Sequence, residues 1–149
     1  MLTKKYFILK VDPKKKMMFN PKESIDFAGH TGPFIQYTYA RIKSVLRKNE
    51  SAVAVALAVE ILPLEKKLLK RLYDFPAVVK QAGAEYNPSI VANYAYDLAR
   101  DFNHFYHEIN ILKEEKANLR SFRLSLAAKT AEVIASSMKL LGIDVPEKM

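Results

Sequence analysis

The chain has 149 residues, and 50% of them are apolar, which favours one domain with a sizeable buried core. It contains no cysteine, which excludes a disulfide framework, a thiolate metal site and a thiol nucleophile. The formal net charge of +8 favours a polyanionic partner such as nucleic acid, although a protein with a lysine-rich surface has the same charge.

The first residues differ in pattern from the rest of the chain. Residues 6–11 are rich in β-formers, Asp12-Pro13 predicts a turn, and residues 17–19 could pair back on the first segment. The sequence therefore predicts a short β-hairpin. Because such a hairpin is marginal alone, we interpret residues 1–29 as the trailing edge of a larger domain or as a linker. Residues 30–149 form the next domain in this interpretation.

From Thr31 onward the apolar residues follow a helical period. Thr31-Gly32-Pro33 opens the first helix, because proline suits the first helical position. The stripe of this helix consists of Ile35, Tyr39, Ile42 and Leu46. The expected helices of this half cover residues 31–49, 63–73 and 77–82, with a break at the Asp74-Phe75-Pro76 segment.

Two longer helices complete the pattern. Asn87-Pro88 is suited to start a helix whose apolar positions continue to Leu112, and a polar linker at 113–118 leads into the last helix. Gly142 follows that helix, where glycine commonly ends one. The sequence therefore predicts an all-α fold, an antiparallel helical bundle behind the short β-hairpin-like appendage. The longest apolar run, 52–62, is too short to cross a bilayer, so we expect a cytoplasmic protein.

The first helix carries a polar face opposite its apolar stripe, formed by Tyr37, Arg41, Ser44 and Lys48. A tyrosine one turn from an arginine offers a flat stacking surface beside a planar donor fork. This combination suits an unstacked base next to its phosphate. An exposed Tyr–Arg stack without function has the same pattern, and this alternative stays open.

The helix that starts at Asn87-Pro88 carries His104 and His107 near acidic residues, with Asp101 at a carboxylate–histidine spacing. The last helix offers no facing ligands, because its outer side carries lysine, arginine and serine. We therefore expect no metal here and interpret these side chains as solvated. No nucleophile elbow, glycine-rich phosphate loop or Walker sequence occurs, so we expect no catalytic residue in this chain.

Four segments resemble, in order, the C-terminal part of class I arginyl-tRNA synthetases. They are residues 29–41, which are similar to the signature that opens the anticodon-binding (DALR-type) domain, and residues 94–106, 120–126 and 140–149. The chain departs from the signature at His30, Phe34 and Tyr39. The His-x-Gly-His and Lys-Met-Ser-Lys-Ser motifs are absent. The resemblance therefore implies the C-terminal piece of a longer arginine–tRNA ligase, inactive alone, with ATP and Mg in the parent's catalytic domain and no cofactor here.

The resemblance implies a domain that binds the anticodon stem and loop of arginine tRNA (tRNA-Arg) and packs against the missing catalytic domain of the same chain. It implies neither a membrane nor DNA as a partner. Every arginine anticodon has a central C, which such a domain should recognise. The residues expected at the tRNA are Gln36, Tyr37, Arg41, Ser44, Lys48, Asn103, Tyr106, Arg123, Lys148 and Met149.

Two alternatives remain open at this point. Asn103, Tyr106 and Arg123 could pack helices together instead of contacting RNA. The chain as a whole could be a helical protein-interaction module without RNA binding of its own.

Overall fold

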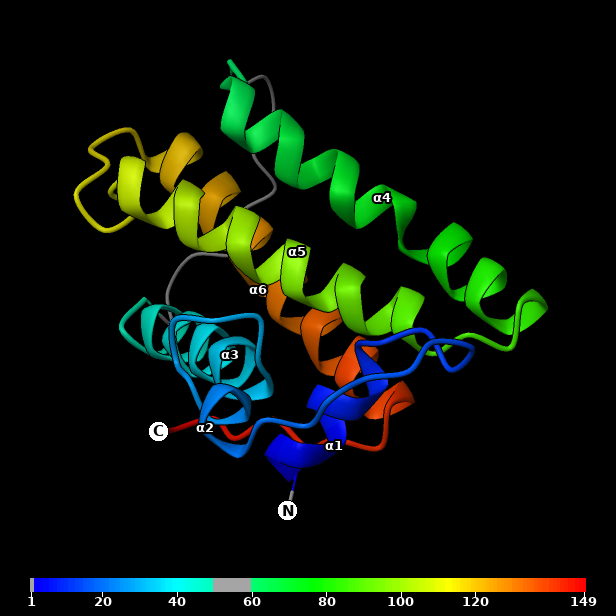
Figure 1. Cartoon of the computed structure of the whole chain (residues 1–149). Helices are drawn as coiled ribbons and strands as arrows, with labels where there is room; N and C mark the ends of the chain where they lie inside the picture. Colours follow the sequence, from blue (N-terminus) through cyan, green and yellow to red (C-terminus); the bar gives the residue numbers. More distant parts are fainter. Residues whose placement is uncertain (1, 50–59) are drawn as a thin grey trace.

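The computed structural model describes residues 2–49 and 60–149 (Figure 1). Within these ranges the chain forms helices and no strand, which confirms the all-α prediction. The helices are α1 (Leu2–Leu9), α2 (Pro21–Ser24), α3 (Gly32–Arg47), α4 (Pro63–Ala84), α5 (Ser89–Glu108) and α6 (Ala117–Leu140). The helix α5 packs against α4, α3 and α6, and Figure 1 shows α4 running beside it. Short loops join α4 to α5 and α5 to α6, as expected for antiparallel neighbours.

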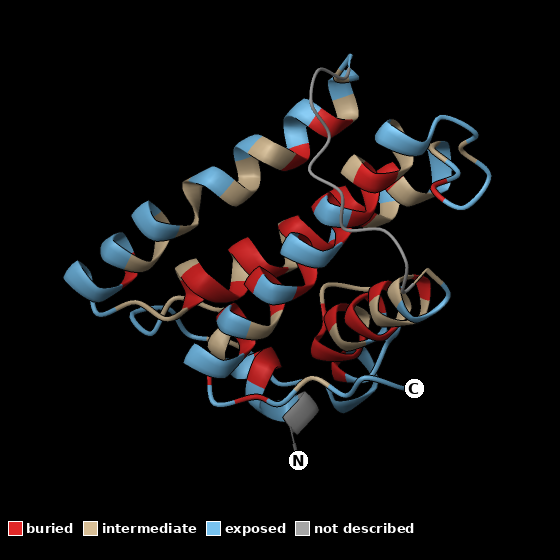
Figure 2. Ribbon diagram, turned by 180° about the vertical axis from the view of Figure 1, so that it is seen from behind, coloured by how far each residue is buried: buried red, intermediate tan, exposed pale blue. Residues whose placement is uncertain are grey.

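The core is built from the inward faces of the long helices. On α5 the predicted positions Leu98, Phe102 and Phe105 have no exposed area, and Ile134 and Met138 of α6 are equally buried. Figure 2 shows the buried residues gathered on the sides of the helices that face one another. Burying a large apolar side chain contributes about 1.5–3 kcal/mol, so these stripes explain why the helices associate.

The segment after α5 differs from the sequence pattern. Leu112 was expected as the last apolar position of the helix, but α5 ends at Glu108 and Leu112 is 37% exposed. Ile111 is buried instead. The backbone becomes extended at Ile109 (φ −119°, ψ 111°), so the helical period no longer decides which side chain faces the core.

The β-hairpin prediction for the N-terminal residues is wrong, because Leu2–Leu9 forms the helix α1. The helix buries Tyr6 and Phe7, and the Tyr6 hydroxyl donates a hydrogen bond to the Ala92 carbonyl of α5 at 2.8 Å. A helix this short is marginal alone, so its contacts with the bundle stabilise it. Tertiary packing has overridden the β-propensity of these side chains.

The break expected at residues 74–76 is also absent, since α4 continues through Pro76 to Ala84. Proline lacks the N–H that would bond the carbonyl four residues earlier, but Pro76 lies on the exposed side of α4, where water is available. On the inner side, Phe75 stacks on Tyr94 of α5 with ring centroids 5.4 Å apart. The Tyr94 hydroxyl also donates to the Arg71 carbonyl at 2.8 Å. These contacts with α5 hold both halves of α4 in line.

Two helix ends are formed as the sequence predicts. Thr31 is the N-cap of α3, and its side chain accepts a hydrogen bond from the Phe34 N–H. After α6, Gly142 adopts a φ of +65°, which favours glycine. The N–H groups of Gly142 and Ile143 bond the carbonyls of Lys139 and Met138, both at 2.9 Å, which is the Schellman pattern. This ending turns the C-terminal tail back toward α3.

A buried group of charges joins the start of α4 to α6. The Arg123 guanidinium contacts Glu65 at 2.7 Å and Glu114 at 2.6 Å, and Glu65 also accepts a hydrogen bond from the Leu62 N–H at 2.7 Å. Glu65 has no exposed area and the Arg123 side chain is 6% exposed. Buried charges cost desolvation energy and are tolerated only when they are paired in this way.

Replacing Arg123 by Met should therefore destabilise the protein by about 3–5 kcal/mol, because Glu65 is left buried without its partner. Urea unfolding measures the loss. The matched control is Arg100→Met, which removes an exposed pair with Asp97 and should change stability by less than about 1 kcal/mol. Equal effects of the two substitutions would contradict the structural importance of this buried group.

The N-terminal segment is held on the bundle near His30. The Lys10 ammonium donates to the His30 carbonyl at 2.9 Å, and the His30 ring stacks on Tyr96 of α5 with centroids 3.9 Å apart. The Nε2 atom of His30 is buried and has no hydrogen-bond partner in the described part of the chain. Burial, helped by nearby Lys10, lowers the pKa of His30 from 6.5 to about 4. The folded state therefore favours the neutral imidazole.

This depressed pKa predicts how stability depends on pH. As pH falls below 6.5, His30 becomes protonated in the unfolded chain, whereas in the folded protein it stays neutral until about pH 4. The free energy of unfolding therefore falls as pH falls across this interval. His30→Gln should remove about 1 kcal/mol of the stability difference between pH 7 and pH 5, after allowance for partial exposure. Urea unfolding at the two pH values measures this difference. An unchanged difference in the His30→Gln protein would show that this buried ring does not set the pH dependence.

No helix in the described ranges is long and apolar enough to cross a membrane. Most of the apolar run at 52–62 lies outside those ranges.

Candidate nucleic-acid interface

A hollow of about 440 Å³ lies between one face of α3, the end of α5 with the loop that follows it, and the C-terminal tail. Seven of the ten residues expected at the tRNA line it: Tyr37, Arg41, Ser44, Lys48, Tyr106, Lys148 and Met149. The helical period places the four α3 residues on one face, which is why the sequence pattern could group them. Ala40, Val45, Arg47 and Leu112 complete the lining.

Arg41 lines this hollow and contacts two aromatic rings. Its guanidinium carbon is 4.8 Å from the ring centroid of Tyr37 and 5.6 Å from that of Tyr106. Tyr37 is 44% exposed, so one face of a stacking surface is accessible to a ligand. Arginine has five N–H donors in a fixed planar fork, so donors remain for a ligand after the internal contacts are made.

Asn103 lies behind Arg41 and fixes its position. Its side-chain oxygen accepts a hydrogen bond from the Arg41 guanidinium at 2.5 Å, and its side-chain N–H donates to the Thr38 hydroxyl at 2.7 Å. Asn103 therefore connects α5 to α3 and does not line the hollow. Its contacts support the packing role that the sequence left open, with the added effect of orienting Arg41.

The C-terminal tail forms one wall of the hollow because α3 holds it. The Gln36 side chain donates to the Asp144 carbonyl at 2.8 Å, and Lys43 forms an ion pair with Glu147 at 2.9 Å. The Arg47 guanidinium donates to the Glu147 carbonyl at 3.2 Å. Gln36, expected at the tRNA, thus contacts the tail instead of lining the hollow. The sequence carried no signal for these contacts, since two of them end on backbone carbonyls.

The charged side chains that line the hollow all have one sign. Its lining includes Arg41, Arg47, Lys48 and Lys148 but no carboxylate side chain among the described residues. Cations beside exposed aromatic rings attract phosphates and stack on bases at the same time. The arrangement is therefore suited to a single-stranded nucleic-acid segment, and it brings together no nucleophile with a general base.

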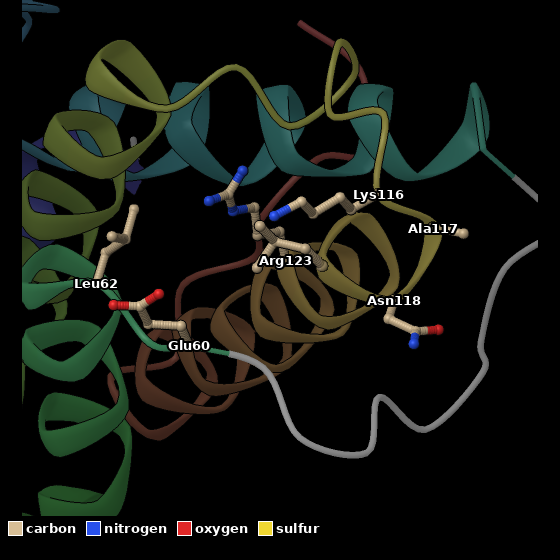
Figure 3. Close-up of a pocket in the computed structure, with 7 residues that line it drawn as sticks. Glu60, Leu62, Lys116, Ala117, Asn118 and Arg123 are labelled. Carbon is tan, nitrogen blue, oxygen red and sulfur yellow. The ribbon is translucent and has the colours of Figure 1, made fainter.

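Arg123 lies apart from this hollow, in the buried ion pairs between α4 and α6. It borders a second hollow of about 480 Å³, where Figure 3 shows Glu60 and Leu62 on the segment entering α4, opposite Arg123 and Lys116. Both ends of its guanidinium are engaged by carboxylates, so we propose for Arg123 the packing role that the sequence left open.

The acidic residue near the two histidines of α5 is also engaged. Asp101 contacts Lys67 at 2.8 Å and Arg71 at 2.9 Å, both from α4. Burial raises the pKa of Asp101, but the hydrogen bonds from these two cations outweigh burial, and the net pKa is lowered. In the described part of the chain no three histidine or acidic side chains gather as a metal site would require.

Comparison with known proteins shows the family to which this chain belongs. The family model described as the DALR anticodon binding domain matches residues 35–149, so the chain belongs to this family of helical anticodon-binding domains. Its relatives are arginine–tRNA ligases. The ligase of Phocaeicola vulgatus is 58% identical over 97% of this chain and 25% of its own length. That of Flavobacterium psychrophilum is 52% identical over 97% and 24%.

Solved structures agree with this assignment. Arginyl-tRNA synthetase of Thermus thermophilus superposes with a TM-score of 0.91 at 35% identity, over 97% of this chain and 26% of that protein. The Plasmodium falciparum enzyme superposes with a TM-score of 0.85 at 29% identity, over 99% and 26%. The chain thus spans about a quarter of the length of the relatives it matches. These matches support anticodon recognition, and not the alternative of a helical protein-interaction module.

The position of the tail provides a prediction. Lys43→Glu or Glu147→Lys alone should increase the population of the open tail by about two- to fivefold, because an exposed ion pair becomes a repulsion. Amide hydrogen exchange near Met149 measures the opening, and the double exchange should restore it. An exchange of Lys129 with Glu132, an exposed pair on α6, is the matched control and should leave the tail unchanged. A tail that opens equally in the single and double variants would contradict the tether.

The same pair predicts a pH range for the closed tail. The hydrogen bond with Lys43 holds the pKa of Glu147 below its usual 4.5, so the tether is lost as pH falls through that lowered pKa. The hydrogen bond with Glu147 raises the pKa of Lys43 above its usual 10.5, so the tether is also lost as pH rises through that raised pKa. Exchange at the tail should therefore accelerate at both extremes and not between them, once corrected for intrinsic rates.

Proposed function

We propose that this chain binds the anticodon stem and loop of tRNA-Arg as the recognition part of an arginine–tRNA ligase. The observation that carries the proposal is the hollow itself. Tyr37, Arg41 and Tyr106 combine stacking surfaces with a donor fork, and the C-terminal tail closes one side. Membership of the anticodon-binding family supports this assignment of the hollow.

The genetic code defines what such a site must recognise. Arginine codons all have G in the middle, so the central anticodon base is always C. In a single-stranded loop this base can leave the stack, lie against an aromatic ring and present its Watson–Crick edge to hydrogen-bond donors and acceptors. We propose that Tyr37 supplies the stacking surface and Arg41 the donors. Lys48, Arg47 and Lys148 are suited to the neighbouring phosphates, while Ser44, Tyr106 and Met149 form the remaining walls.

The parent enzyme belongs to the same proposal. Residues 1–29 would be the trailing edge of its catalytic domain or a linker, and residues 30–149 the anticodon-binding domain. The start of the family match at residue 35 supports this division. ATP and Mg would bind in the catalytic domain, outside this chain, which would be inactive alone. We also propose a cytoplasmic location, with tRNA-Arg and the catalytic domain as partners and neither DNA nor a membrane.

The experiment separates base recognition from phosphate contact. Tyr37→Ala should remove stacking worth ~1–3 kcal/mol and reduce the preference for tRNA-Arg over a transcript whose central C is changed. Lys48→Ala should weaken the binding of both RNAs alike and leave their ratio intact. Competition binding with the two transcripts measures both effects. Tyr73→Ala, which removes an 85% exposed tyrosine of α4, is the matched control and should change neither affinity.

If Tyr37→Ala weakens both RNAs by the same factor, or weakens neither, Tyr37 does not recognise a base. The exposed Tyr–Arg stack without function would then be the better account of this helix face.

A further inference from the structure

The Ser44 hydroxyl differs from the buried hydroxyls of the long helices. Thr38, Thr130 and Ser137 each donate a hydrogen bond to the carbonyl four residues earlier, at 2.8–2.9 Å. Ser44 lies inside α3 and lines the hollow, yet in the described part of the chain its hydroxyl has no hydrogen-bond partner. Its side chain is half-buried. A hydroxyl that is partly withdrawn from water and free of internal hydrogen bonds is available to a ligand.

The hollow otherwise offers mainly hydrogen-bond donors. Its charged side chains are arginines and lysines, which have no acceptor atom. Among the described lining residues there is no carboxylate, side-chain amide or imidazole. The side-chain oxygens that can accept a hydrogen bond are therefore the hydroxyls of Tyr37, Ser44 and Tyr106.

Cytosine and uracil differ in what they require of such a site. The Watson–Crick edge of cytosine places the 4-amino donor beside two acceptors, N3 and O2, whereas uracil has an acceptor at O4 and a donor at N3. A site that selects cytosine therefore needs an acceptor for the amino group next to donors for N3 and O2. Arg41 and Ser44 are three residues apart on α3, so their side chains are neighbours on one helix face. Together they present a donor fork beside a hydroxyl oxygen.

The two tyrosine hydroxyls are less suited to this role. A ring that stacks on a base holds its own hydroxyl in a plane parallel to that base, where it cannot reach the base edge. This geometry applies to Tyr37, the proposed stacking surface. Tyr106 comes from α5 and stacks there on Phe102 with centroids 6.0 Å apart, whereas Ser44 shares a helix with Arg41.

We propose that Ser44 determines the specificity of this hollow for cytosine, because its hydroxyl accepts a hydrogen bond from the 4-amino group of the central anticodon base. Arg41 donates to N3 and O2 of the same base. The inference rests on the proposed function, because that function supplies the base. Uracil is rejected in this arrangement, since its N3–H faces the donors of Arg41, which cannot accept a hydrogen bond.

The test removes each side of this hydrogen bond in turn. One probe is a synthetic anticodon stem-loop of tRNA-Arg, and the other is the same RNA with 2-pyrimidinone, which lacks the 4-amino group, in place of the central cytosine. The protein variant is Ser44→Ala, which keeps a good helix former in α3. The matched control is Ser125→Ala, which removes an exposed hydroxyl of α6.

The unsubstituted chain should bind the 2-pyrimidinone RNA about three- to tenfold more weakly than the cytosine RNA, because one hydrogen bond is lost. Ser44→Ala should bind the cytosine RNA more weakly by a similar factor and should bind both RNAs equally. The double change is therefore far from additive, which a merely structural effect of Ser44 on the hollow would not produce. Ser125→Ala should retain both affinities of the unsubstituted chain.

Two outcomes would overturn the role of Ser44 while leaving the proposed function in place. One is a Ser44→Ala protein that still discriminates between the two RNAs as strongly as the unsubstituted chain. The other is loss of this discrimination in Tyr106→Phe instead, which would assign the acceptor to the Tyr106 hydroxyl. The proposed function fails separately, if the unsubstituted chain binds the cytosine stem-loop no better than one whose central base is guanine. The assignment of Ser44 would then fail with it.

Discussion

The structure depends on the burial of α5 by three neighbouring helices. Its apolar face, with Leu98, Phe102 and Phe105 fully enclosed, provides the surface on which α3, α4 and α6 pack. Because α3 crosses α5 near its end, the outward faces of the two helices meet where the apolar core stops. Tyr106, which follows this core on α5, lines the hollow, so the same helix organises both the fold and the candidate site.

The hydrogen-bond chain from Thr38 through Asn103 to Arg41 shows how the core positions the site. Thr38 has no exposed area, whereas Arg41 borders the hollow, and Asn103 bonds both. A side chain held in this way loses less conformational freedom when a ligand binds, so more of its interaction energy appears as affinity. The tail adds a second constraint, because Gln36, Lys43 and Arg47 hold it against α3.

The sequence predicted those features that repeat along a helix. The stripe of α5, the polar face of α3 and the glycine at the end of α6 each have a pattern that local physics explains. It failed where a distant partner overrides local preference. Tyr6 and Phe7 favour a strand, yet docking against Ala92 and its neighbours makes them helical. Pro76 favours a break, yet the contacts between α4 and α5 continue across it. At the candidate site, two of the tethers of the tail had no sequence pattern, since a bond to a backbone carbonyl is independent of the residue type that carries the carbonyl.

Net charge is informative only once the cations are separated by environment. Arg123 and Arg71 are held by carboxylates in contacts that join helices, so their charges are internally compensated. Arg41, Lys48 and Lys148 differ, because no carboxylate in the described part of the chain forms an ion pair with them. Cations without an ion-pair partner can replace the counterions that condense on a polyanion. The release of these counterions is the source of phosphate affinity. Part of the positive charge is therefore neutralised by ion pairs within the fold, and another part is concentrated at the hollow beside α3.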